Sequence, residues 1–143
     1  MTVGRICVRS VDIVKPNESV REAARRMREA DVGALIVIDD KRFPMGIITD
    51  RDIALRCVAG DRDPDDTVVS EAMTCPVLCV SESTPIEEAL RRMAGIAARR
   101  IGVTDPDGRL AGILALDDVL ELLVEEAETI GRLLKRRHPA LEA

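Results

Sequence analysis

Aromatic side chains are almost absent from this chain: it has one phenylalanine, Phe43, and neither tyrosine nor tryptophan. Any hydrophobic core must therefore consist of Val, Ile, Leu, Ala and Met. Proteins that bind single-stranded nucleic acid without sequence preference stack the bases on aromatic rings. The scarcity of rings argues against that class, and a nucleobase bound here would lie between aliphatic side chains.

The chain also lacks an excess of positive charge and a long apolar run. Its formal net charge is −5, whereas nucleic-acid-binding domains usually carry a basic patch or stripe. No apolar run approaches the roughly 20 residues that a membrane-spanning helix needs. The N-terminal "MTVGRICVRS" has no signal-peptide core. We therefore expect a cytoplasmic protein with no nucleic-acid or membrane partner.

Metal ligands and catalytic groups are equally scarce. The single histidine, His138, lies in the polar C-terminal tail. The four cysteines, Cys7, Cys57, Cys75 and Cys79, are expected to be free thiols packed as small apolar groups. Cys75 and Cys79 are four residues apart, but a zinc site would need further ligands. With no nucleophile beside a base and no GxxxxGK[ST] phosphate loop, we predict neither a metal site nor an enzyme.

What the chain does contain is an internal repeat. Shifted by 66 residues, as from Gly46 to Gly112, the sequence aligns with itself without a gap from Val11 to Val58. The segment "ESVREAARRM" falls on "TPIEEALRRM", and "GIITDRDI" falls on "GILALDDV". A repeat of this length indicates two supersecondary units that bury their apolar faces against each other.

Each copy of the repeat reads as β-α-β-β-α. Short apolar runs predict strands, and apolar residues at helical spacing predict helices. Ser19 with Glu22 is a predicted capping box, and Thr84 is the predicted N-cap before Pro85. In the first copy we expect strands at 11–14, 34–39 and 45–49 and helices at 20–30 and 50–59. In the second copy we expect strands at 76–80, 100–105 and 111–115 and helices at 85–96 and 117–126.

The predicted domain boundaries follow the repeat. The first domain covers residues 6–59, an acidic, turn-rich linker covers 60–68, the second domain covers 69–126, and a helical extension and tail cover 127–143. The last helical pattern runs on to residue 137 and ends in "KRRH", where the helix dipole favours cations. It carries an apolar stripe formed by Leu120, Leu123, Val124, Ala127, Ile130, Leu133 and Leu134. Two interpretations stay open, a helix packed on its own module or a contact between two copies.

The repeated strand-to-helix corner resembles a known motif. "GIITDRDI" fits G-h-h-T-x-x-D, where h is apolar, and so resembles the closing motif of a CBS domain. Together with "DVGALIVIDD" and "GVTDPDGRLAGIL", the tandem arrangement is similar to a CBS pair, or Bateman module, of the small stand-alone bacterial type. The resemblance covers about residues 6–126. It implies a mixed α/β (α+β) fold with two β-α-β-β-α units packed about a pseudo-two-fold axis.

The resemblance also implies a ligand. CBS pairs commonly bind AMP, ADP, ATP or S-adenosylmethionine in clefts between the units, as regulatory ligands and not as catalytic cofactors. The motif aspartate holds the ribose, so Asp52 and Asp118 are the expected ribose-binding residues. Neighbouring hydroxyl or basic groups hold phosphate, and the candidates are Thr49, Arg51, Arg99 and Arg100. The family's base-binding positions correspond here to Val11, Asp12, Ile13, Ala34, Leu35, Cys75, Pro76, Val77, Arg100 and Ile101.

Physical chemistry offers a plainer interpretation of the same corner. A carboxylate at a helix start is stabilised by free backbone N–H groups and by the helix dipole, so Asp52 and Asp118 can be helix-start residues alone. Asp50 and Asp52 would repel a phosphate placed too close, and a nearby arginine would have to offset that repulsion. In the second copy Ala115 stands where the motif has threonine. We therefore expect Asp52 to contribute more to binding than Asp118.

Two functions from different classes follow. The first is a sensor that binds an adenine nucleotide, or alternatively S-adenosylmethionine, and signals to a separate effector protein. The second is a ligand-free structural or interaction module. In both cases we expect a homodimer, because CBS pairs as a family pair into disc-shaped dimers.

Overall fold

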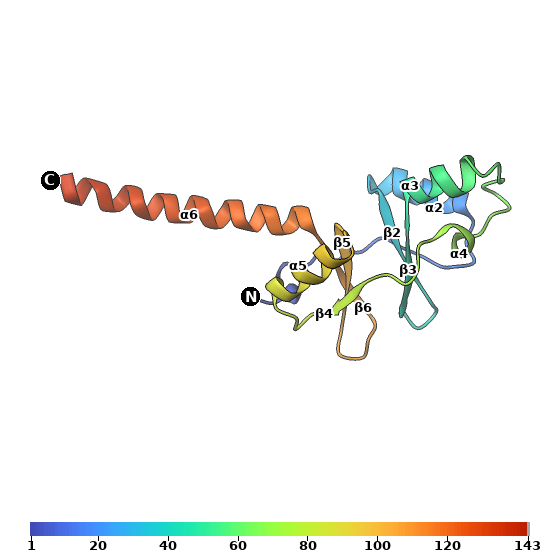
Figure 1. Ribbon diagram of the computed structural model, residues 1–143, viewed down its shortest axis with the longest axis horizontal. Coiled ribbons are helices and arrows are strands. Elements are labelled where there is room, and N and C mark those ends of the chain that lie inside the picture. The colour runs from blue at the N-terminus through green and yellow to red at the C-terminus, as the bar shows by residue number, and fades with distance from the viewer. Residues whose placement is uncertain (143) are drawn as a thin grey trace.

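Two three-stranded sheets, one from each copy of the repeat, form the framework of the molecule (Figure 1). The computed structural model describes the backbone of residues 1–142 and the side chains of residues 1–136. The basic end of the tail, with Arg137 and His138, thus lies outside the described side chains. Within the described residues no helix is both long and apolar enough to span a bilayer.

The two copies have the same connectivity. In each sheet the first and second strands are parallel and the second and third are antiparallel. The first copy consists of β1 (Ile13–Val14), α2 (Val20–Ala30), β2 (Ala34–Ile38), β3 (Pro44–Thr49), a short α3 (Asp50–Asp52) and the π-helical η1 (Ile53–Val58). The second copy consists of β4 (Cys79–Ser81), α5 (Ile86–Gly95), β5 (Arg100–Thr104), β6 (Leu110–Ala115) and α6 (Leu116–Glu142). The predicted β-α-β-β-α order is confirmed in both.

Local sequence explains where the helices begin. α2 has its predicted bounds, and the Ser19 hydroxyl accepts a hydrogen bond from the Glu22 N–H at 3.1 Å. The predicted Thr84 cap of the second helix is wrong. Pro85 is the N-cap because its backbone is extended, with ψ at 145°, so α5 starts one residue later than expected. The Thr84 carbonyl instead accepts a hydrogen bond from the Val3 N–H at 2.8 Å.

Two short helices that the sequence pattern did not predict join the copies to each other. They are α1 (Val3–Ile6) and α4 (Val69–Ala72), and each belongs to a segment that we call a strap. The N-terminal strap, residues 2–8, forms isolated bridges to Pro85 and Ile113 of the second copy. The linker strap, residues 68–74, forms the corresponding bridges to Ser19 and Ile47 of the first copy. The two straps are therefore related by the same repeat as the two units. Each strap packs on one unit, and the chain then continues into the other unit.

The straps are bound by backbone hydrogen bonds and by burial. Val8 and Ile113 exchange two N–H···O bonds of 2.9 and 3.0 Å, and Thr74 and Ile47 exchange two of 2.8 and 2.9 Å. Val3 lies fully buried in the core of the second unit, and Val69 lies fully buried in the core of the first. Neither unit has a complete core without the strap that precedes the other.

A third apolar cluster lies between the two sheets. Its buried members are Ile36, Ile38 and Leu110, and partly buried residues packed against them are Val11, Ile13, Ile47, Val77 and Ile113. The two hairpin tips also touch, since the Arg109 guanidinium lies 5.8 Å from the Phe43 ring centroid. β1 and β4 are shorter than predicted, and the residues before them, which include Val11 and Val77, form connections along this junction instead.

Each motif glycine lies where a strap crosses the sheet. A Cβ atom at Gly46 would be 2.7 Å from the Thr74 carbonyl oxygen, and one at Gly112 would be 2.8 Å from the Val8 carbonyl oxygen. Real Cβ atoms do not approach backbone oxygen so closely. The glycine of G-h-h-T-x-x-D is thus required by the strap and not by the turn that follows it.

An ion pair holds the first unit where the linker strap meets it. The Glu18 carboxylate accepts hydrogen bonds from the Arg26 guanidinium at 2.6 and 3.1 Å and from the Lys15 N–H at 2.7 Å. The Glu18 carbonyl accepts from the Val69 N–H at 2.8 Å. The hydrogen bond from Arg26, helped by its charge, lowers the pKa of Glu18 below its ordinary 4.5.

Replacing Gly46 with alanine should destabilise the fold, because the new methyl group would push the linker strap off the sheet. We expect Gly46→Ala to lower the free energy of unfolding by about 1–3 kcal/mol, measured by urea denaturation. Gly95→Ala is the matched control, since a Cβ there meets nothing within 4 Å, and it should be neutral or add up to about 1 kcal/mol. Equal effects of the two variants would contradict this account of the strap.

The Glu18 ion pair should give a pH-dependent contribution to stability. Because the folded pKa is lowered, the contribution is present above the unfolded pKa and is lost as the pH falls through the folded value. Glu18→Gln should cost about 1 kcal/mol at neutral pH, since both side chains are part-exposed, and the difference from wild type should shrink below pH 4.5. Glu88→Gln, which breaks an exposed pair with Arg92, should cost less than about 0.5 kcal/mol. A pH-independent effect of Glu18→Gln would rule out the ion pair as its cause.

Candidate functional site

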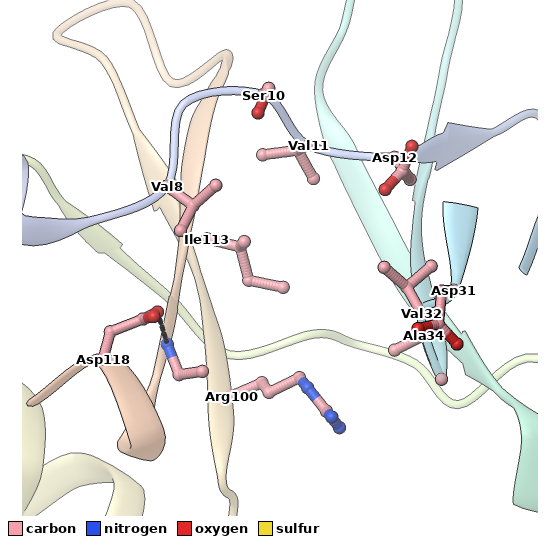
Figure 2. Close-up of a pocket in the computed structure, with 12 residues that line it drawn as sticks. Val8, Ser10, Val11, Asp12, Asp31, Val32, Ala34, Arg100, Ile113 and Asp118 are labelled. Carbon is pink, nitrogen blue, oxygen red and sulfur yellow. Dashed lines mark hydrogen bonds between the residues drawn. The ribbon is translucent and has the colours of Figure 1, made fainter. Parts of the chain in front are cut away.

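A cavity of about 310 Å³ lies where the two units meet (Figure 2). Its first wall comes from the connection before β1 and from the turn between α2 and β2. Its second wall comes from β5, β6 and the first turn of α6. The larger apolar residues of the lining are Val8, Val11, Val32 and Ile113, and the small ones are Gly33, Ala34 and Ala115. The polar part consists of Ser10, Asp12, Asp31, Arg100 and Asp118. Both units and the N-terminal strap are needed to build it.

Asp118 is positioned by the start of α6. Its Oδ2 accepts a hydrogen bond from the Ala115 N–H at 3.1 Å, as Figure 2 shows. Among the described residues no other group donates to this carboxylate, so Oδ1 is free to accept a hydrogen bond from a ligand. The side chain lines the cavity and is half-buried. A carboxylate at this place can hold a diol while the helix start stabilises its charge.

Asp52, the repeat partner of Asp118, is more fully engaged. Its Oδ2 accepts from the Thr49 N–H at 3.0 Å, and the Thr49 hydroxyl accepts from the Asp52 N–H at 3.0 Å, which completes a capping box. The Thr74 hydroxyl, from the linker strap, donates to the same carboxylate at 3.2 and 3.4 Å. Asp52 therefore serves as a helix-start residue, and its carboxylate already has hydrogen-bond donors from two segments.

The difference between the two corners comes from the straps. Thr74 and Val8 occupy equivalent positions in the repeat, and each exchanges backbone hydrogen bonds with the third strand of a unit. Thr74 carries a hydroxyl that donates to Asp52, whereas Val8 carries none and lines the cavity beside Asp118. A valine in place of a threonine thus leaves the Asp118 carboxylate available.

The arginines lie at the edge of the cavity. Arg100 begins β5 and pairs in register with Ala115 at the end of β6. Figure 2 shows its side chain extending from the second unit into the space between the two walls. A second cavity of about 350 Å³ adjoins the first, because Arg100 and Ala115 line both, and Arg99 and Asp117 complete it.

Charge differs between these two spaces. The first cavity has three carboxylates, those of Asp12, Asp31 and Asp118, and one guanidinium. The adjoining cavity has two guanidiniums and one carboxylate, that of Asp117. A neutral or cationic group is therefore favoured in the first space, and an anionic group is favoured beside Arg99 and Arg100.

The remaining predicted site residues lie in several places. Val11, Asp12 and Ala34 line the first cavity. The side chains of Leu35 and Ile101 are buried in the two unit cores, so only their backbone groups could meet a ligand. Arg51 is exposed and lies outside the residues that line either cavity. Ile13 and Val77 belong to the cluster between the sheets, and Cys75 and Pro76 follow the linker strap.

Sequence reasoning left seven cavity residues out of its candidates, namely Val8, Ser10, Asp31, Val32, Gly33, Ile113 and Ala115, the last of which it noted only as the residue in place of the motif threonine. Val8 and Ser10 could not be found because neither the strap nor the connection that follows it was predicted to reach the cavity. Asp31 was not recognised as a cavity residue for another reason. It is the C-cap of α2 in a left-handed conformation, with φ at 54°, and its sequence context is that of an ordinary helix end. Ile113 follows the motif glycine, and its apolar side chain gave no sign of a ligand.

The described residues form neither a reactive thiol site nor a metal-ligand cluster beside the cavity. All four cysteines are free. Burial raises the pKa of the Cys79 thiol above its ordinary 9.0, and it outweighs the nearby Arg9 charge to raise that of Cys7 as well. Such thiols stay protonated at neutral pH and behave as packing groups. Over the part of the chain that the structure describes, no three His, Cys, Asp or Glu residues gather as metal ligands would.

Comparison with known proteins finds CBS-domain proteins both by family model and by solved structure. A family model described as "CBS domain" matches residues 3–58 and again residues 69–125. An uncharacterized protein of Methanopyrus kandleri is 32% identical over 136 residues, which cover 95% of this chain and 69% of that protein. The CBS-pair protein CBSX2 of Arabidopsis thaliana has a solved structure with a TM-score of 0.78 at 30% identity, covering 89% of this chain and 96% of that chain.

Two further solved structures bear on ligands and assembly. A structure of CBSX2 in complex with AMP has a TM-score of 0.75 at 31% identity, covering 88% of this chain and 98% of that chain. A CBS-CP12 protein from bloom-forming cyanobacteria, described as hexameric, has a TM-score of 0.72 at 27% identity and covers 84% of this chain and 69% of that chain.

Proposed function

This chain belongs to the CBS-domain family, in which it forms a CBS pair, and from that premise we propose that it binds an adenine nucleotide in the cavity beside Asp118. The role is regulatory and not catalytic, and the signal passes to a separate effector protein. The observation that carries the proposal is the cavity itself. It brings a carboxylate with a free oxygen, four aliphatic side chains and a guanidinium together from both units.

The ribose and the base have distinct places in this proposal. Asp118 Oδ1 accepts hydrogen bonds from the ribose hydroxyls, as acidic residues do in other nucleotide sites. The adenine lies among the aliphatic side chains of Val8, Val11, Val32 and Ile113. Backbone groups of the connection before β1 and of the start of β2 read the base edge, which agrees with the absence of aromatic rings.

The phosphate points toward the adjoining cavity. Three carboxylates would repel it in the first space, whereas Arg99 and Arg100 attract it in the second. Each guanidinium can make two parallel hydrogen bonds to phosphate oxygens. A single phosphate fits this arrangement best, because a longer chain of phosphates would bring more charge near Asp117. We therefore favour AMP over ADP and ATP, and the AMP complex of CBSX2 supports this choice.

S-adenosylmethionine is the second candidate, and one observation favours it. Its sulfonium carries a positive charge, and the first cavity has an excess of carboxylates from Asp12, Asp31 and Asp118. The two ligands share adenosine and differ in the sign of the charge beyond the ribose. Arg100 is therefore the residue whose replacement separates them.

Asp118 is proposed as the stronger ribose-binding residue, which reverses the order expected from the motif. The motif argument gave weight to Thr49, but the Thr49 hydroxyl is used as the cap of its own helix. Thr74 further occupies the Asp52 carboxylate. A ligand at Asp52 would have to displace that hydroxyl, whereas a ligand at Asp118 would not.

Regulation follows from the place of the cavity between two units. A ligand that binds one relative arrangement of the units better than another shifts their equilibrium toward it. α6 begins beside the cavity, so such a shift would also move the projecting helix. We further propose that the protein acts as a homodimer, because CBS pairs as a family pair into dimers. The hexameric CBS-CP12 protein supports only the coarser expectation that the chain oligomerises.

The ribose site is tested by replacing Asp118. At about 100 times its dissociation constant, AMP should add roughly 2.7 kcal/mol to the stability of the wild type. Asp118→Ala should weaken AMP binding by about 1.5–3 kcal/mol, because a charged hydrogen-bond acceptor is lost. Isothermal titration calorimetry measures the affinity, and circular dichroism checks that each variant is folded.

Asp52→Ala is the matched control, since it removes the equivalent carboxylate from the other unit. It should leave AMP affinity close to that of the wild type. A larger loss with Asp52→Ala than with Asp118→Ala would reverse the proposed order of the sites. If AMP, ATP and S-adenosylmethionine all failed to bind the wild type, the chain would be the ligand-free module.

The phosphate position is tested by replacing Arg100 with glutamine and comparing ligands. Arg100→Gln should weaken AMP by about 1.5–3 kcal/mol and leave adenosine nearly unchanged, because only AMP has a group for the guanidinium to bind. Arg51→Gln, which removes an exposed arginine outside the cavity, should change neither. A variant that binds S-adenosylmethionine more tightly than the wild type does would favour the second candidate.

A further inference from the structure

One continuous segment joins the core of the second unit to the wall of the cavity. Val3, in the N-terminal strap, is fully buried in that core. Val8, at the end of the same strap, lines the cavity, as do Ser10, Val11 and Asp12 of the connection that follows. Figure 2 shows this connection crossing from Val8 on the second unit to Asp12 on the first. The position of this cavity wall therefore depends on how the strap lies on the second unit.

The strap is held on the second unit by a small number of contacts. The Val3 N–H donates to the Thr84 carbonyl at 2.8 Å, and the Gly4 N–H donates at the same distance to the Glu82 carbonyl. The Arg9 guanidinium adds hydrogen bonds to the Glu82 carboxylate at 2.9 Å and to the Gly4 carbonyl at 2.8 Å. Within residues 2–8, Val3 alone is buried, and the others are partly or fully exposed. Segments with so little burial open at a lower free energy than the whole fold.

Gly4 shows how closely the strap approaches the second unit. A Cβ atom there would be 2.8 Å from the Glu82 carbonyl oxygen, closer than real Cβ atoms come to backbone oxygen. The equivalent residue of the linker strap is Ser70, so the repeat itself does not require glycine at this position. A side chain at position 4 would lift the N-terminal strap off its unit.

The linker strap provides an internal comparison. It docks on the first unit in the same way, and Val69, the repeat equivalent of Val3, is fully buried in the first core. Of the described residues that line the cavity, none belongs to residues 68–74. The two straps thus have the same structural role, and the N-terminal strap alone also builds the ligand site.

We propose that docking of the N-terminal strap is coupled to nucleotide binding, and that Val3 and Gly4 act as positioning residues for the ligand. The inference rests on the proposed function, because it concerns the same cavity. A docked strap holds Val8 and Val11 where the adenine contacts them, and a released strap removes that wall. A nucleotide therefore shifts the equilibrium toward the docked form. Conversely, the apparent affinity falls with the fraction of molecules whose strap is docked.

Truncation of two equivalent valines tests the coupling. Val3→Ala and Val69→Ala remove the same atoms from a fully buried side chain, so both should lower the urea midpoint of the full-length protein. In calorimetric titrations, Val3→Ala should weaken AMP binding at least about fivefold, because fewer molecules have a docked strap. Val69→Ala should weaken AMP binding by less than about twofold, because its strap lies outside the cavity.

A second substitution perturbs the strap in the opposite way, by adding atoms. Gly4→Ala leaves Val3 intact but places a methyl group against the Glu82 carbonyl. It should weaken AMP binding by a factor similar to that of Val3→Ala. Gly95→Ala is the matched control, since its Cβ meets nothing within 4 Å, and it should leave the AMP affinity unchanged.

Hydrogen exchange of the wild type tests the coupling without any substitution. Saturating AMP should slow exchange of the Val3 and Gly4 N–H groups, whose hydrogen bonds break when the strap opens. The Val69 and Thr74 N–H groups of the linker strap are the comparison, and AMP should slow their exchange at least about threefold less. Equal slowing in the two straps would contradict a specific link between the N-terminal strap and the ligand.

The outcomes separate the coupling from the proposed function. Equal losses of AMP affinity in Val3→Ala and Val69→Ala would show that affinity follows overall stability, which would overturn the coupling. Unchanged affinity in both Val3→Ala and Gly4→Ala, with a wild type that binds AMP, would overturn the coupling alone. A wild type that binds no adenine nucleotide would overturn the proposed function and the coupling with it.

Discussion

Each unit is completed by a strap that comes from the segment before the other unit, and this exchange shapes the cores, the motif glycines and the cavity. Residues 2–8 complete the second unit and residues 68–74 complete the first, each through a pair of backbone hydrogen bonds to the third strand. Because the strap carbonyl lies directly over the strand, Gly46 and Gly112 cannot carry a side chain. Neither core is full without its strap, since Val3 and Val69 fill places inside them. The two copies are therefore expected to fold as one cooperative body.

The same exchange explains why two nearly identical corners differ in chemistry. The backbone of the two straps repeats, but their side chains differ. The Thr74 hydroxyl donates to the Asp52 carboxylate, whereas Val8 has no hydroxyl to donate to Asp118. Arg100 stands where the first unit has Ala34, so only one corner gains a guanidinium. A duplicated fold thus provides one corner committed to stability and one available to a ligand. The asymmetry also links the site to α6, because Asp118 lies in the first turn of the helix that projects from the body.

Much of the fold could be predicted from the sequence, because its signals are local. Ser19 and the apolar spacing of residues 20–30 set the bounds of α2, and the apolar runs at 34–38 and 100–104 marked strands buried on both faces. The prediction that Thr84 caps α5 was wrong for a local reason too. The extended ψ of Pro85 makes Pro85 the N-cap, so the helix begins one residue later. The candidate site was predictable only in part. Asp118, Arg100 and Ala34 carried motif or charge signals, whereas Val8 and Asp31 carried none that distinguished them from ordinary strap and helix-end residues.

Residue order alone was enough to predict that two β-α-β-β-α units repeat, that α2 begins after Ser19, and which face of the last helix is apolar. These follow from periodicity, capping and residue type within a few positions of the chain. Which segment completes which unit, and hence which aspartate keeps a free oxygen, followed only from the packing of the folded chain. That choice depends on a contact between positions far apart in the sequence, Thr74 with Asp52 and Val8 with Ile113. Residue type fixed what each corner could do, and the path of the straps fixed which corner remained open to a ligand.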